Sequence, residues 1–379
     1  MAARTIVIAV TTPMAVDLLL LPQLPALGEA GWRIHLVCSH GPVSAAVRPL
    51  VAGLHAIPLA RAVSPVRDLA SVARMRRLLL TIRPDVVLGS TPKAAMVSMI
   101  AARLARVPVR VFQVRGARWE GEAGLARRLL VWADRRTAAS ATDVIAVSAS
   151  LAELVRAEGI VSTVPRVLGR GGSKGVDLAL FLPDPAHAFR PDRPRLGFAG
   201  RLSSDKGIDQ LIEVVAAVRR AVPGATCEVV GDVDPAQPSS ARALAVLRED
   251  PAFSWAGAVP QAELARAMRA WDLLVFPSAR EGLPNVVIEA AACGVPSVAW
   301  DVTGVRDAVD DARTGRLVPF GDIDGMARAA LESLAEPAHA SLRAAAVDWA
   351  ASGFDSRSLG SALVAYLDEA CQRAAGEST

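Results

Sequence analysis

The sequence predicts an α/β fold built from two doubly wound domains, and three observations predict it. Apolar strand-like runs alternate with helical segments along the chain. The alternation breaks once, between residues 164 and 195, in a stretch of glycines, prolines and turns. The length of 379 residues suffices for two domains of ordinary size. We therefore expect one domain over residues 1–185 and a second over 186–355, followed by a segment over 356–379 that either closes the second domain or crosses back to the first.

Each domain is expected to hold a parallel sheet with helices on both faces, because its strands are continuous apolar runs. The first domain's strands are expected over 5–10, 33–39, 85–90, 109–114 and 143–148, with helices up to 30 and over 68–82, 94–105, 125–140 and 149–159. The second domain's strands are expected over 195–200, 226–232, 253–259, 273–278 and 296–301, with helices over 207–222, 239–249, 262–271 and 285–293. A final helix is expected over 358–373.

Composition favours a cytoplasmic protein. The best candidate for a membrane span, residues 14–27, is broken by Asp17, Pro22 and Pro25, and no run approaches the ~18 apolar residues that a span needs. No charged start precedes an apolar signal core. The four cysteines are scattered without metal or redox spacing, which suits buried thiols in a reducing compartment: Cys38, Cys227, Cys293 and Cys371.

Charge divides unevenly between the two halves. Residues 1–185 hold 23 Lys and Arg against 12 Asp and Glu, whereas residues 186–379 hold 19 against 26. The net charges are therefore +11 and −7, which together give the overall +4. A basic first half suggests an anionic partner such as a phosphate, a nucleic acid or a membrane surface. Solvated arginines in an arginine-rich composition would give the same balance.

The segment "GRLSSDKG", residues 200–207, places two cations between a strand and a helix. Arg201 offers a planar fork and Lys206 a compact charge, and the helix that follows offers backbone N–H groups and a positive dipole. Lys206 is one of only three lysines, with Lys93 and Lys174. The pair suits a diphosphate, although an ordinary turn with solvated charges has the same sequence.

A second segment, "EGLPNVVIEAAACGVP", sets two glutamates on either side of a turn into a helix that Gly294 can end. Glu289 lies about one turn into that helix, where a carboxylate can accept hydrogen bonds from ribose hydroxyls. Glu281 precedes the turn and could reach a sugar beyond the diphosphate. A capping carboxylate beside a solvated glutamate is the alternative.

Together the two segments resemble the signature of the retaining glycosyltransferases of the GT-B fold, in which two Rossmann-like domains face each other across a cleft. The resemblance spans nearly the whole chain, and seven residues separate the glutamates as in that family. It implies that Arg201 and Lys206 bind the donor diphosphate, that Glu289 binds ribose and that Glu281 contacts the sugar. It also implies that residues 253–257 pass the nucleobase and that the last helix crosses back to the first domain. The implied donor-binding set is Gly200, Arg201, Lys206, Trp255, Gly257, Glu281, Gly282, Leu283, Pro284, Asn285, Val286 and Glu289.

A narrower resemblance lies in the first half, where "GSTPKA", "VRGARWEG" and "GGSKGVDLALF" are similar to segments of bacterial transferases that build capsule, O-antigen and other lipid-linked glycans. It implies acceptor-side roles for Thr91, Lys93, Arg115 and Arg118. Two departures stand out. The family often has a Gly-Gly loop after the first strand, where this chain has "TTPMAVD", and a histidine where this chain has Arg115. An arginine there can stabilise negative charge but does not readily act as a general base.

We therefore expect a retaining, metal-independent hexosyl- or N-acetylhexosaminyltransferase of polysaccharide biosynthesis, without a cofactor. Its expected donor is a nucleotide diphosphate sugar, with UDP preferred over GDP and ADP, and its catalytic residues are Arg201, Lys206, Glu281 and Arg115. Its acceptor is expected to be lipid-linked or a glycan, with no nucleic acid partner. The alternatives are a soluble small-molecule acceptor, a nucleotide-sugar 2-epimerase or a non-catalytic sensor.

Two arginine-rich helices of the first domain also predict peripheral contact with the anionic inner face of the cell membrane. The helix within 67–83 carries five arginines around Leu69, Val72, Leu78 and Leu79, and the helix within 125–136 carries four beside Leu129, Leu130 and Trp132. Basic and apolar side chains on one helix suit an anionic lipid surface. The alternative is that the apolar residues pack on the sheet while the arginines are solvated.

Overall fold

The computed structural model describes residues 4–59, 64–233 and 237–376, and the chain divides into two compact units. Unit 1 comprises Met1–Gly175 with Ser356–Thr379, and unit 2 comprises Val176–Asp355. Their boundary falls between residues 175 and 176, earlier in the chain than the sequence suggests. Each unit is a doubly wound parallel sheet covered by helices, which confirms the predicted fold class.

Unit 1 contains a seven-stranded parallel sheet in the order β3-β2-β1-β4-β5-β6-β7. Its strands are β1 Thr5–Ala9, β2 Arg33–Cys38, β3 Gly53–Ala56, β4 Val86–Ser90, β5 Val109–Val114, β6 Asp143–Ala146 and β7 Arg166–Val167. The strand order reverses between β1 and β4, and the carboxyl ends of strands at such a switch point are where open α/β sheets bind ligands. The short edge strands β3 and β7 are additions to the predicted set.

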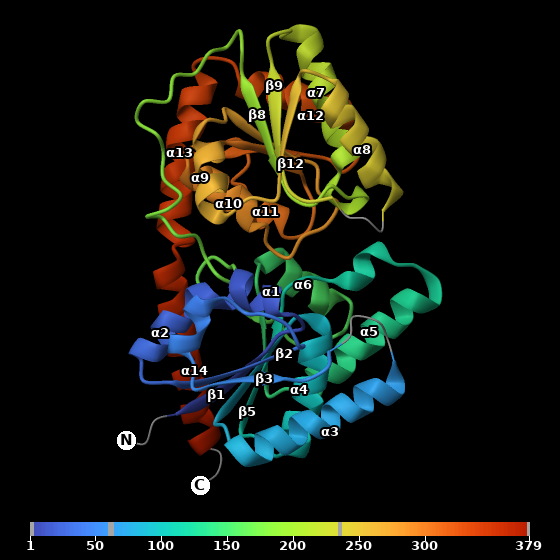
Figure 1. The fold of residues 1–379 in the computed structure, drawn as a ribbon, viewed down its shortest axis with the longest axis vertical. Helices are drawn as coiled ribbons and strands as arrows, with labels where there is room; N and C mark the ends of the chain where they lie inside the picture. Colours follow the sequence, from blue (N-terminus) through green and yellow to red (C-terminus); the bar gives the residue numbers. More distant parts are fainter. Residues whose placement is uncertain (1–3, 60–63, 234–236, 377–379) are drawn as a thin grey trace. The chain divides into compact units, whose positions relative to one another are not determined.

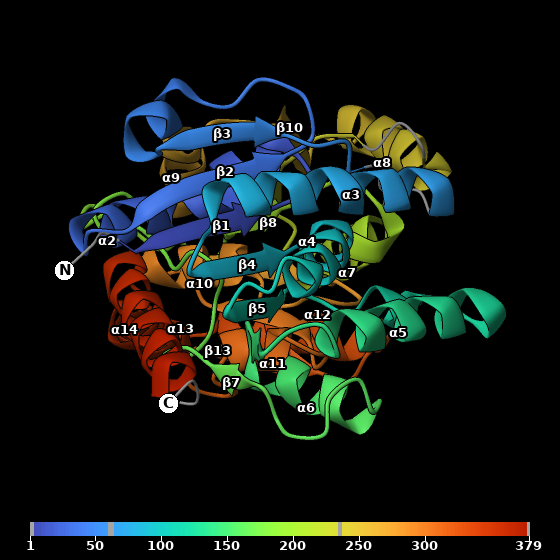
Figure 2. The same cartoon turned by 90° about the horizontal axis from the view of Figure 1, so that it is seen from below.

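Helices cover both faces of this sheet, as Figures 1 and 2 show. Helices α3, α4 and α5 lie on one face, with α4 packed against both of its neighbours, whereas α2 and α14 pack together on the other. The helical segments are α1 Pro13–Ala15, the π-helix η1 Val16–Leu20, the 3₁₀-helix η2 Leu21–Gln23, α2 Leu24–Glu29, η3 Ala45–Leu50, α3 Pro65–Ile82, α4 Pro92–Leu104, η4 Arg118–Gly121, α5 Gly124–Ala138, α6 Ala149–Ala157 and α14 Ser356–Gly376.

The first helical stretch is broken into four pieces, where the sequence predicts one helix up to residue 30. Pro22 lies in η2 and Pro25 lies in the first turn of α2. Because proline lacks a backbone N–H and clashes with the preceding turn, each is placed where a new helical segment begins.

The last helix, α14, completes the core of unit 1. Its Leu363 and Leu367 are buried together with Leu24 and Leu27 of α2, in the cluster that also holds the β1 residue Ile8. Ion pairs then join its exposed side to the same unit, with distances of 2.7 Å for Arg166 Nη1 to Glu369 Oε2 and 2.6 Å for Arg373 Nη2 to Asp143 Oδ1. The final segment is therefore part of unit 1 by packing as well as by charge.

Unit 2 contains a six-stranded parallel sheet in the order β10-β9-β8-β11-β12-β13. Its strands are β8 Arg195–Ala199, β9 Thr226–Val230, β10 Phe253–Gly257, β11 Leu273–Phe276, β12 Ser297–Trp300 and β13 Gly315–Val318. Its helical segments are η5 Ser204–Lys206, α7 Ile208–Ala221, α8 Pro238–Glu249, α9 Gln261–Arg269, α10 Asn285–Ala292, α11 Val305–Ala308, α12 Ile323–Ser333 and α13 Ala338–Gly353. The switch point lies between β8 and β11.

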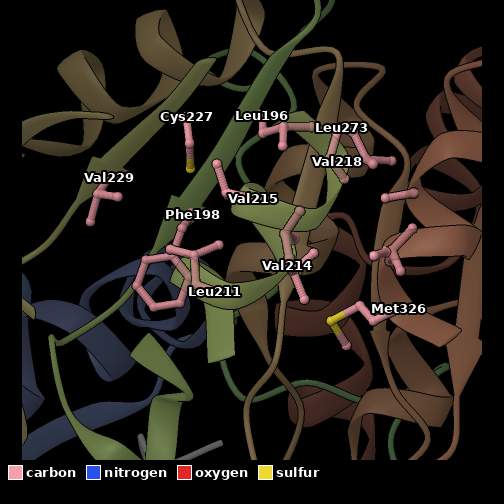
Figure 3. Packing of buried hydrophobic residues seen from close by; sticks show 14 of the residues in the cluster. Leu196, Phe198, Leu211, Val214, Val215, Val218, Cys227, Val229, Leu273 and Met326 are labelled. Carbon is pink, nitrogen blue, oxygen red and sulfur yellow. The ribbon is translucent and has the colours of Figure 1, made fainter. Parts of the chain in front are cut away.

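The core of unit 2 forms where α7 and α12 cover the sheet, as Figure 3 shows. Val214 and Val218 of α7 point toward Leu196 of β8 and Met326 of α12, and all four are completely buried. These α7 residues recur at helical spacing, so burying one stripe of α7 anchors the helix whose amino end follows the 200–207 loop. Packing in this layer thereby sets the position of that loop.

Three of the four cysteines are buried, and all four are free thiols. Burial raises the pKa of Cys293 to about 12, so that this thiol stays protonated at neutral pH. No helix among the described residues combines the length and the hydropathy that a membrane span requires.

A pair of histidines on β2 and β3 predicts how stability changes with pH. His35 Nδ1 lies 3.0 Å from His55 Nε2, and burial lowers the pKa of both, with the neighbouring charges of His55 and Arg33 also lowering that of His35. The two histidines bind protons more readily in the unfolded chain than in the folded one. Their contribution to the free energy of unfolding is therefore complete above pH 6.5 and decreases as the pH falls below it. Denaturant titrations at pH 7.5 and 5.5 should show that the free energy of unfolding decreases less for His55→Gln than for the wild type. Equal losses would contradict this explanation.

Candidate functional site

The candidate site of unit 2 lies at its switch point, where the loops after β8 and β11 meet. Ala279 N donates to Asp205 O at 2.9 Å, and Ser278 Oγ lies 3.3 Å from the same oxygen. These contacts hold the residues that follow β11 against η5, which follows β8. Two segments more than seventy residues apart in the chain thus form a single site.

The predicted cation and the first predicted carboxylate meet directly in this site. Lys206 Nζ lies 2.5 Å from Glu281 Oε1, and both side chains are largely buried, with 21% and 14% of their side-chain surface exposed. Ser278 Oγ donates to the same Glu281 oxygen at 2.9 Å. Lys206 and Ser278 therefore fix one carboxylate oxygen, while an anion that reaches Lys206 must share the ammonium with Glu281.

Three cations surround Asp205 where the loops after β8 and β11 meet, which we call the loop pair. Arg201 Nη2 lies 3.6 Å from Asp205 Oδ2, and Ser203 Oγ donates to Asp205 Oδ1 at 2.6 Å. Burial works to raise the pKa of Asp205, but the Ser203 hydrogen bond and the charges of Lys206, Arg201 and Arg280 together lower it. The Asp205 carboxylate is thus ionised at neutral pH, and the local charge remains positive because three cations face two carboxylates, Asp205 and Glu281.

Two glycines allow the backbone to approach closely around these residues. Gly207 has φ of +74°, and a Cβ there would lie 2.0 Å from Pro277 O. Gly304 has φ of +76°, and a Cβ there would lie 2.4 Å from Gly282 O. Only glycine fits both the left-handed conformation and the available space, so these positions hold the turn at Glu281 and the start of α7 in place.

Substituting Gly207 tests this close packing. We expect Gly207→Ala to lower the free energy of unfolding by ~2 kcal/mol or more, because the left-handed backbone alone costs ~1–2 kcal/mol and the methyl group meets a backbone oxygen. Denaturant titration measures the change. Gly28→Ala in α2 is the matched control, because nothing lies within 4 Å of its Cβ position. If both variants were equally stable, the tight contact with Pro277 would be of no consequence.

Helix α10 places its amino end and Glu289 beside this turn. Its amino end carries the positive end of the helix dipole, which suits an anion, and Val287 N in the first turn donates to Pro284 O at 3.1 Å. Asn285 at its start has a buried Oδ1 without a hydrogen-bond partner within the described chain. Glu289, one turn further on, is only 5% exposed. The structure thus puts a carboxylate on the inner side of the helix rather than in solvent.

The predicted nucleobase segment, β10, runs beside β9. Trp255 Nε1 donates to Gly231 O at 2.9 Å, and the Arg248 guanidinium lies 5.6 Å from the centre of the Trp255 ring. Gly257 ends β10 with φ of +70°, and its carbonyl oxygen accepts a hydrogen bond from Gly231 N at 2.8 Å. The indole N–H of Trp255 is therefore already bonded to the backbone. Only the face of the ring remains to contact other groups.

Unit 1 has polar groups at its own switch point. Thr11, just after β1, and Thr91, just after β4, have hydroxyl oxygens 2.8 Å apart, and Thr11 N donates to Thr91 Oγ1 at 3.0 Å. Thr91 has φ of +74° and immediately precedes α4. The predicted acceptor-side threonine is thus located where a ligand of this sheet would bind.

Arg115, just after β5, has an unusual environment for a charged group. Its Nε donates to Ser90 Oγ, and Ser90 Oγ donates to Gln113 Oε1 at 3.0 Å. Its Nη1 and Nη2 atoms are buried and have no hydrogen-bond partner in the part of the chain that is described. Burial lowers the pKa of Arg115 to about 9, which leaves it a cation at neutral pH. The four N–H bonds on these two atoms are therefore available to an acceptor, and the guanidinium is desolvated.

The other two predicted acceptor-side residues lie in different surroundings. Lys93 is buried, and its Nζ lies 2.6 Å from Asp68 Oδ2, so that it joins α4 to α3 by an ion pair. Arg118 is exposed in η4. The neighbouring Trp119 is buried and donates to Asp134 Oδ2 at 3.1 Å. Burial raises the pKa of Asp134 to about 6.

Sequence reasoning missed Asp205, Ser278, Arg280 and Gly304, which complete the unit 2 site. Asp205 sits inside the quoted loop, but an aspartate beside a lysine usually has a solvated role. Ser278 stands three residues before Glu281, and that spacing is the one signal that was available. The contacts of Asp205 with residues 278–280 depend on β8 lying next to β11, and that of Gly304 depends on β12 lying next to β11. The linear sequence states neither neighbour.

Comparison with known proteins follows the same division into two units. A family model described as "Glycosyl transferase 4-like domain" matches residues 21–171, and one described as "Glycosyl transferases group 1" matches residues 193–336. Together these matches cover most of the chain. The chain belongs to the GT-B glycosyltransferases. This confirms the resemblance to the GT-B glycosyltransferases, while retention and the donor-binding roles of the two segments stay predictions.

Individual relatives place this GT-B transferase close to capsule biosynthesis enzymes. It is 29% identical to the capsular polysaccharide biosynthesis glycosyltransferase CapM of Staphylococcus aureus over 316 residues, 80% of this chain and 81% of CapM. It is 34% identical to a GDP-mannose-dependent alpha-mannosyltransferase of Mycobacterium tuberculosis, over 66% of this chain and 64% of that enzyme. The solved structure of Anabaena Alr3699/HepE in complex with UDP and glucose matches 97% of this chain and 100% of HepE, with a TM-score of 0.75 at 18% identity. At that identity the structure supports the fold alone.

Proposed function

We propose that this GT-B transferase moves a hexosyl or N-acetylhexosaminyl group from a UDP-sugar to a hydroxyl of a lipid-linked or polysaccharide precursor, with retention at the anomeric carbon. The observation that carries the proposal is the contact between Lys206 and Glu281, 2.5 Å apart at the switch point of unit 2. A cation for phosphate and a carboxylate for sugar hydroxyls lie side by side, as a nucleotide sugar requires.

Each part of the donor then has a group of matching chemistry. The diphosphate lies against Arg201, Lys206 and the amino end of α10, where charge-assisted hydrogen bonds are strong. Glu289 accepts hydrogen bonds from the ribose hydroxyls. Glu281, released from Lys206 as the diphosphate takes over the ammonium, accepts them from the transferred sugar. Ser278 keeps the Glu281 carboxylate in position during this exchange.

Retention is proposed through front-face attack. The bond between the anomeric carbon and the phosphate oxygen breaks, the acceptor oxygen bonds to the same face, and the acceptor proton passes to the departing phosphate oxygen. Arg201 and Lys206 stabilise the charge that develops on the leaving diphosphate, so that catalysis rests on positioning and electrostatics without a metal ion. Glu281 is proposed to bind sugar hydroxyls and not to act as a nucleophile, because Ser278 still holds its Oε1 once Lys206 has turned to the diphosphate.

The acceptor is proposed to bind through unit 1. Arg115 supports an acceptor that carries phosphate, because its two Nη atoms are desolvated and unpaired among the described residues. The adjacent Thr91 offers a hydroxyl for a sugar. A diphosphate-linked lipid has both groups. The second candidate, a soluble acceptor without phosphate, would leave the Arg115 guanidinium without a partner.

Two relatives of the chain differ in the nucleotide they use. HepE binds UDP in its solved structure, whereas the mycobacterial mannosyltransferase depends on GDP-mannose. We favour UDP because the match to HepE spans 97% of this chain, whereas the match to the mannosyltransferase spans 66%. Calorimetric titration with UDP and GDP distinguishes the two, and tighter GDP binding would reverse the assignment.

Radiolabelled UDP-sugars incubated with the protein and a membrane extract test the proposed function. Label that moves into the lipid phase supports the proposal. Label in a water-soluble product favours the soluble-acceptor alternative, and a changed free nucleotide sugar indicates an epimerase. If donor binds and no label moves in any fraction, the protein is a sensor and the transferase proposal is wrong.

Contact with an anionic membrane surface is a further part of the proposal. On α5, Leu125, Leu129 and Trp132 recur at helical spacing and are 72%, 56% and 55% exposed. Arg136 lies over the Trp132 ring at 5.5 Å, and Arg128 is exposed on the same helix. On α3, by contrast, the predicted contact residues Val72 and Leu79 are buried on the unit, while Leu69 is 72% exposed. Helix α5 therefore supports membrane contact better than α3 does.

Co-sedimentation with liposomes that contain anionic lipid tests this surface. We expect the wild type to bind at low salt and to dissociate at high salt, because each cation near the leaflet contributes ~1 kcal/mol and salt screens it. Replacing Leu129 and Trp132 by serine should reduce binding at least several-fold. Val164→Ser, which alters an exposed apolar residue elsewhere on unit 1, is the matched control. If the wild type stays in the supernatant at low salt, the membrane proposal fails.

A further inference from the structure

A surface pocket of about 250 Å³ lies on unit 2, at the opposite end of β8 from the donor site, and Arg190, Arg193 and Arg195 in its lining are exposed. Four arginines line it: Arg190, Arg193, Arg195 and Arg269. We call it the arginine cavity. Arg195 begins β8, whereas Gly200 and Arg201 follow the end of this strand. Five strand residues at ~3.3 Å each separate the two sites by roughly 17 Å.

Local structure brings these arginines together. Arg193 N donates to Arg190 O at 2.9 Å, which closes a turn with Pro191 at its second position and sets Arg190 and Arg193 at its two ends. Arg195 N donates to Asp272 Oδ2 at 2.7 Å, which ties the start of β8 to the residue before β11. Arg269 is the last residue of α9, three positions before Asp272.

The two aspartates that also line the cavity do not neutralise these cations. Asp184 Oδ1 accepts from Ala186 N at 2.8 Å. Asp272 is buried, and its Oδ1 lies 2.9 Å from His187 Nε2 while its Oδ2 accepts the Arg195 backbone N–H. Among the described residues, no ion pair links either aspartate to any of the four arginines.

The guanidinium groups themselves have few partners. Neither the Arg190 nor the Arg195 side chain makes a hydrogen bond or ion pair within the described chain, and Arg193 has only a 3.6 Å contact with Asp192. Arg269 donates through Nη2 to Leu180 O at 2.8 Å, but its Nε is buried and has no partner there. Four like charges around one cavity repel one another, and an anion in the cavity would remove that repulsion.

We propose that the arginine cavity binds a phosphate group, either as the free anion or as the end of a phosphomonoester. Arginine forks match phosphate oxygens in pairs, which makes this anion a better fit than a halide. The volume lies slightly below the roughly 300–1,000 Å³ of pockets for drug-sized ligands, which favours a small anion over a nucleotide sugar. The site is distinct from the donor site, and the proposal does not depend on the transferase activity.

Calorimetric titration with inorganic phosphate, in buffers matched for ionic strength, tests the proposal. The titration uses Lys206→Ala protein as its background, so that phosphate binding at the donor site is already weakened. We expect saturable binding in this background, and we expect Arg190→Ser with Arg195→Ser to weaken it at least tenfold. Arg328→Ser, an exposed arginine on α12, is the matched control and should leave it unchanged. Glycerol 3-phosphate in place of phosphate then distinguishes the phosphomonoester, which should bind more tightly if that is the natural ligand.

The melting temperature without phosphate gives an independent measurement. Removing two of four mutually repelling cations should leave it unchanged or raise it. In the Lys206→Ala background, phosphate should stabilise the protein with an intact cavity more than the variant with the two serines. Phosphate binding that is unaffected by the two serines would overturn the proposal. So would a clear drop in the phosphate-free melting temperature, since the arginines would then stabilise unit 2 through contacts of their own.

Discussion

Replacing Lys206 by alanine should lower kcat/KM for sugar transfer by roughly 10²–10³-fold, or ~2–4 kcal/mol of transition-state stabilisation. The ammonium is a largely buried cation whose present partner, Glu281, is proposed to yield to the donor diphosphate. Arg201→Ala should have an effect of the same order, because its guanidinium faces the same loop pair and is half-exposed. Both losses should appear mainly in kcat, since charge on the leaving diphosphate grows toward the transition state.

Arg220→Ala is the matched control for these two variants. Arg220 is an exposed arginine on α7, the helix that follows the donor loop, and it is remote from the switch point. Its loss should leave kcat/KM and the melting temperature unchanged. Wild-type turnover in Lys206→Ala would remove Lys206 from the catalytic set, and a lowered melting temperature in that variant would attribute the loss to folding instead.

The two glutamates should differ in which part of the donor they serve. Glu281→Gln should lower the rate of sugar transfer at least tenfold, because a neutral amide accepts sugar hydroxyls less well than a carboxylate. It should bind UDP as tightly as the wild type or more tightly, since the amide no longer competes with the diphosphate for Lys206. Glu289→Gln should instead weaken UDP and UDP-sugar binding alike, because ribose is common to both.

Calorimetry with UDP and UDP-sugar separates these outcomes. Glu263→Gln, an exposed glutamate on α9, should change neither affinity and serves as the control. If Glu281→Gln weakened UDP binding while Glu289→Gln spared it, the roles of the two residues would be reversed. Both variants keep the size of the side chain, so that packing around the buried Glu289 is disturbed as little as possible.

The predicted strands and helices were readable wherever one residue type dominated a segment. Runs such as residues 5–10 and 273–276 are continuous and apolar, as strands covered on both faces must be. The edge strand β7 has only two residues, and β13 contains a glycine and an arginine beside two apolar residues, so that neither produces a continuous apolar run. Helix α13 is rich in alanine on all sides, and its apolar positions therefore do not stand out at helical spacing.

The residues of the unit 2 site could be predicted from the sequence where a charged residue lies beside turn-forming residues. Arg201, Lys206 and Glu281 each lie next to a loop of glycine, serine or proline, and that local contrast marked them. The direct contact of Lys206 with Glu281 was not predicted, because it depends on the strand order that sets β8 beside β11. Likewise, the ion pair of Lys93 with Asp68 depends on how α3 packs on α4, which residue spacing alone does not encode.

The anomeric configuration of the product tests the central claim most directly. A UDP-α-sugar labelled with ¹³C at the anomeric carbon is incubated with the protein and membrane extract. The one-bond carbon–hydrogen coupling of that carbon is then measured in the purified product. The account predicts transfer with an α-linkage, since the acceptor oxygen attacks the face that the diphosphate leaves while Arg201 and Lys206 hold the latter. A β-linked product would show attack from the opposite face and would contradict the retaining mechanism built on Lys206 and Glu281.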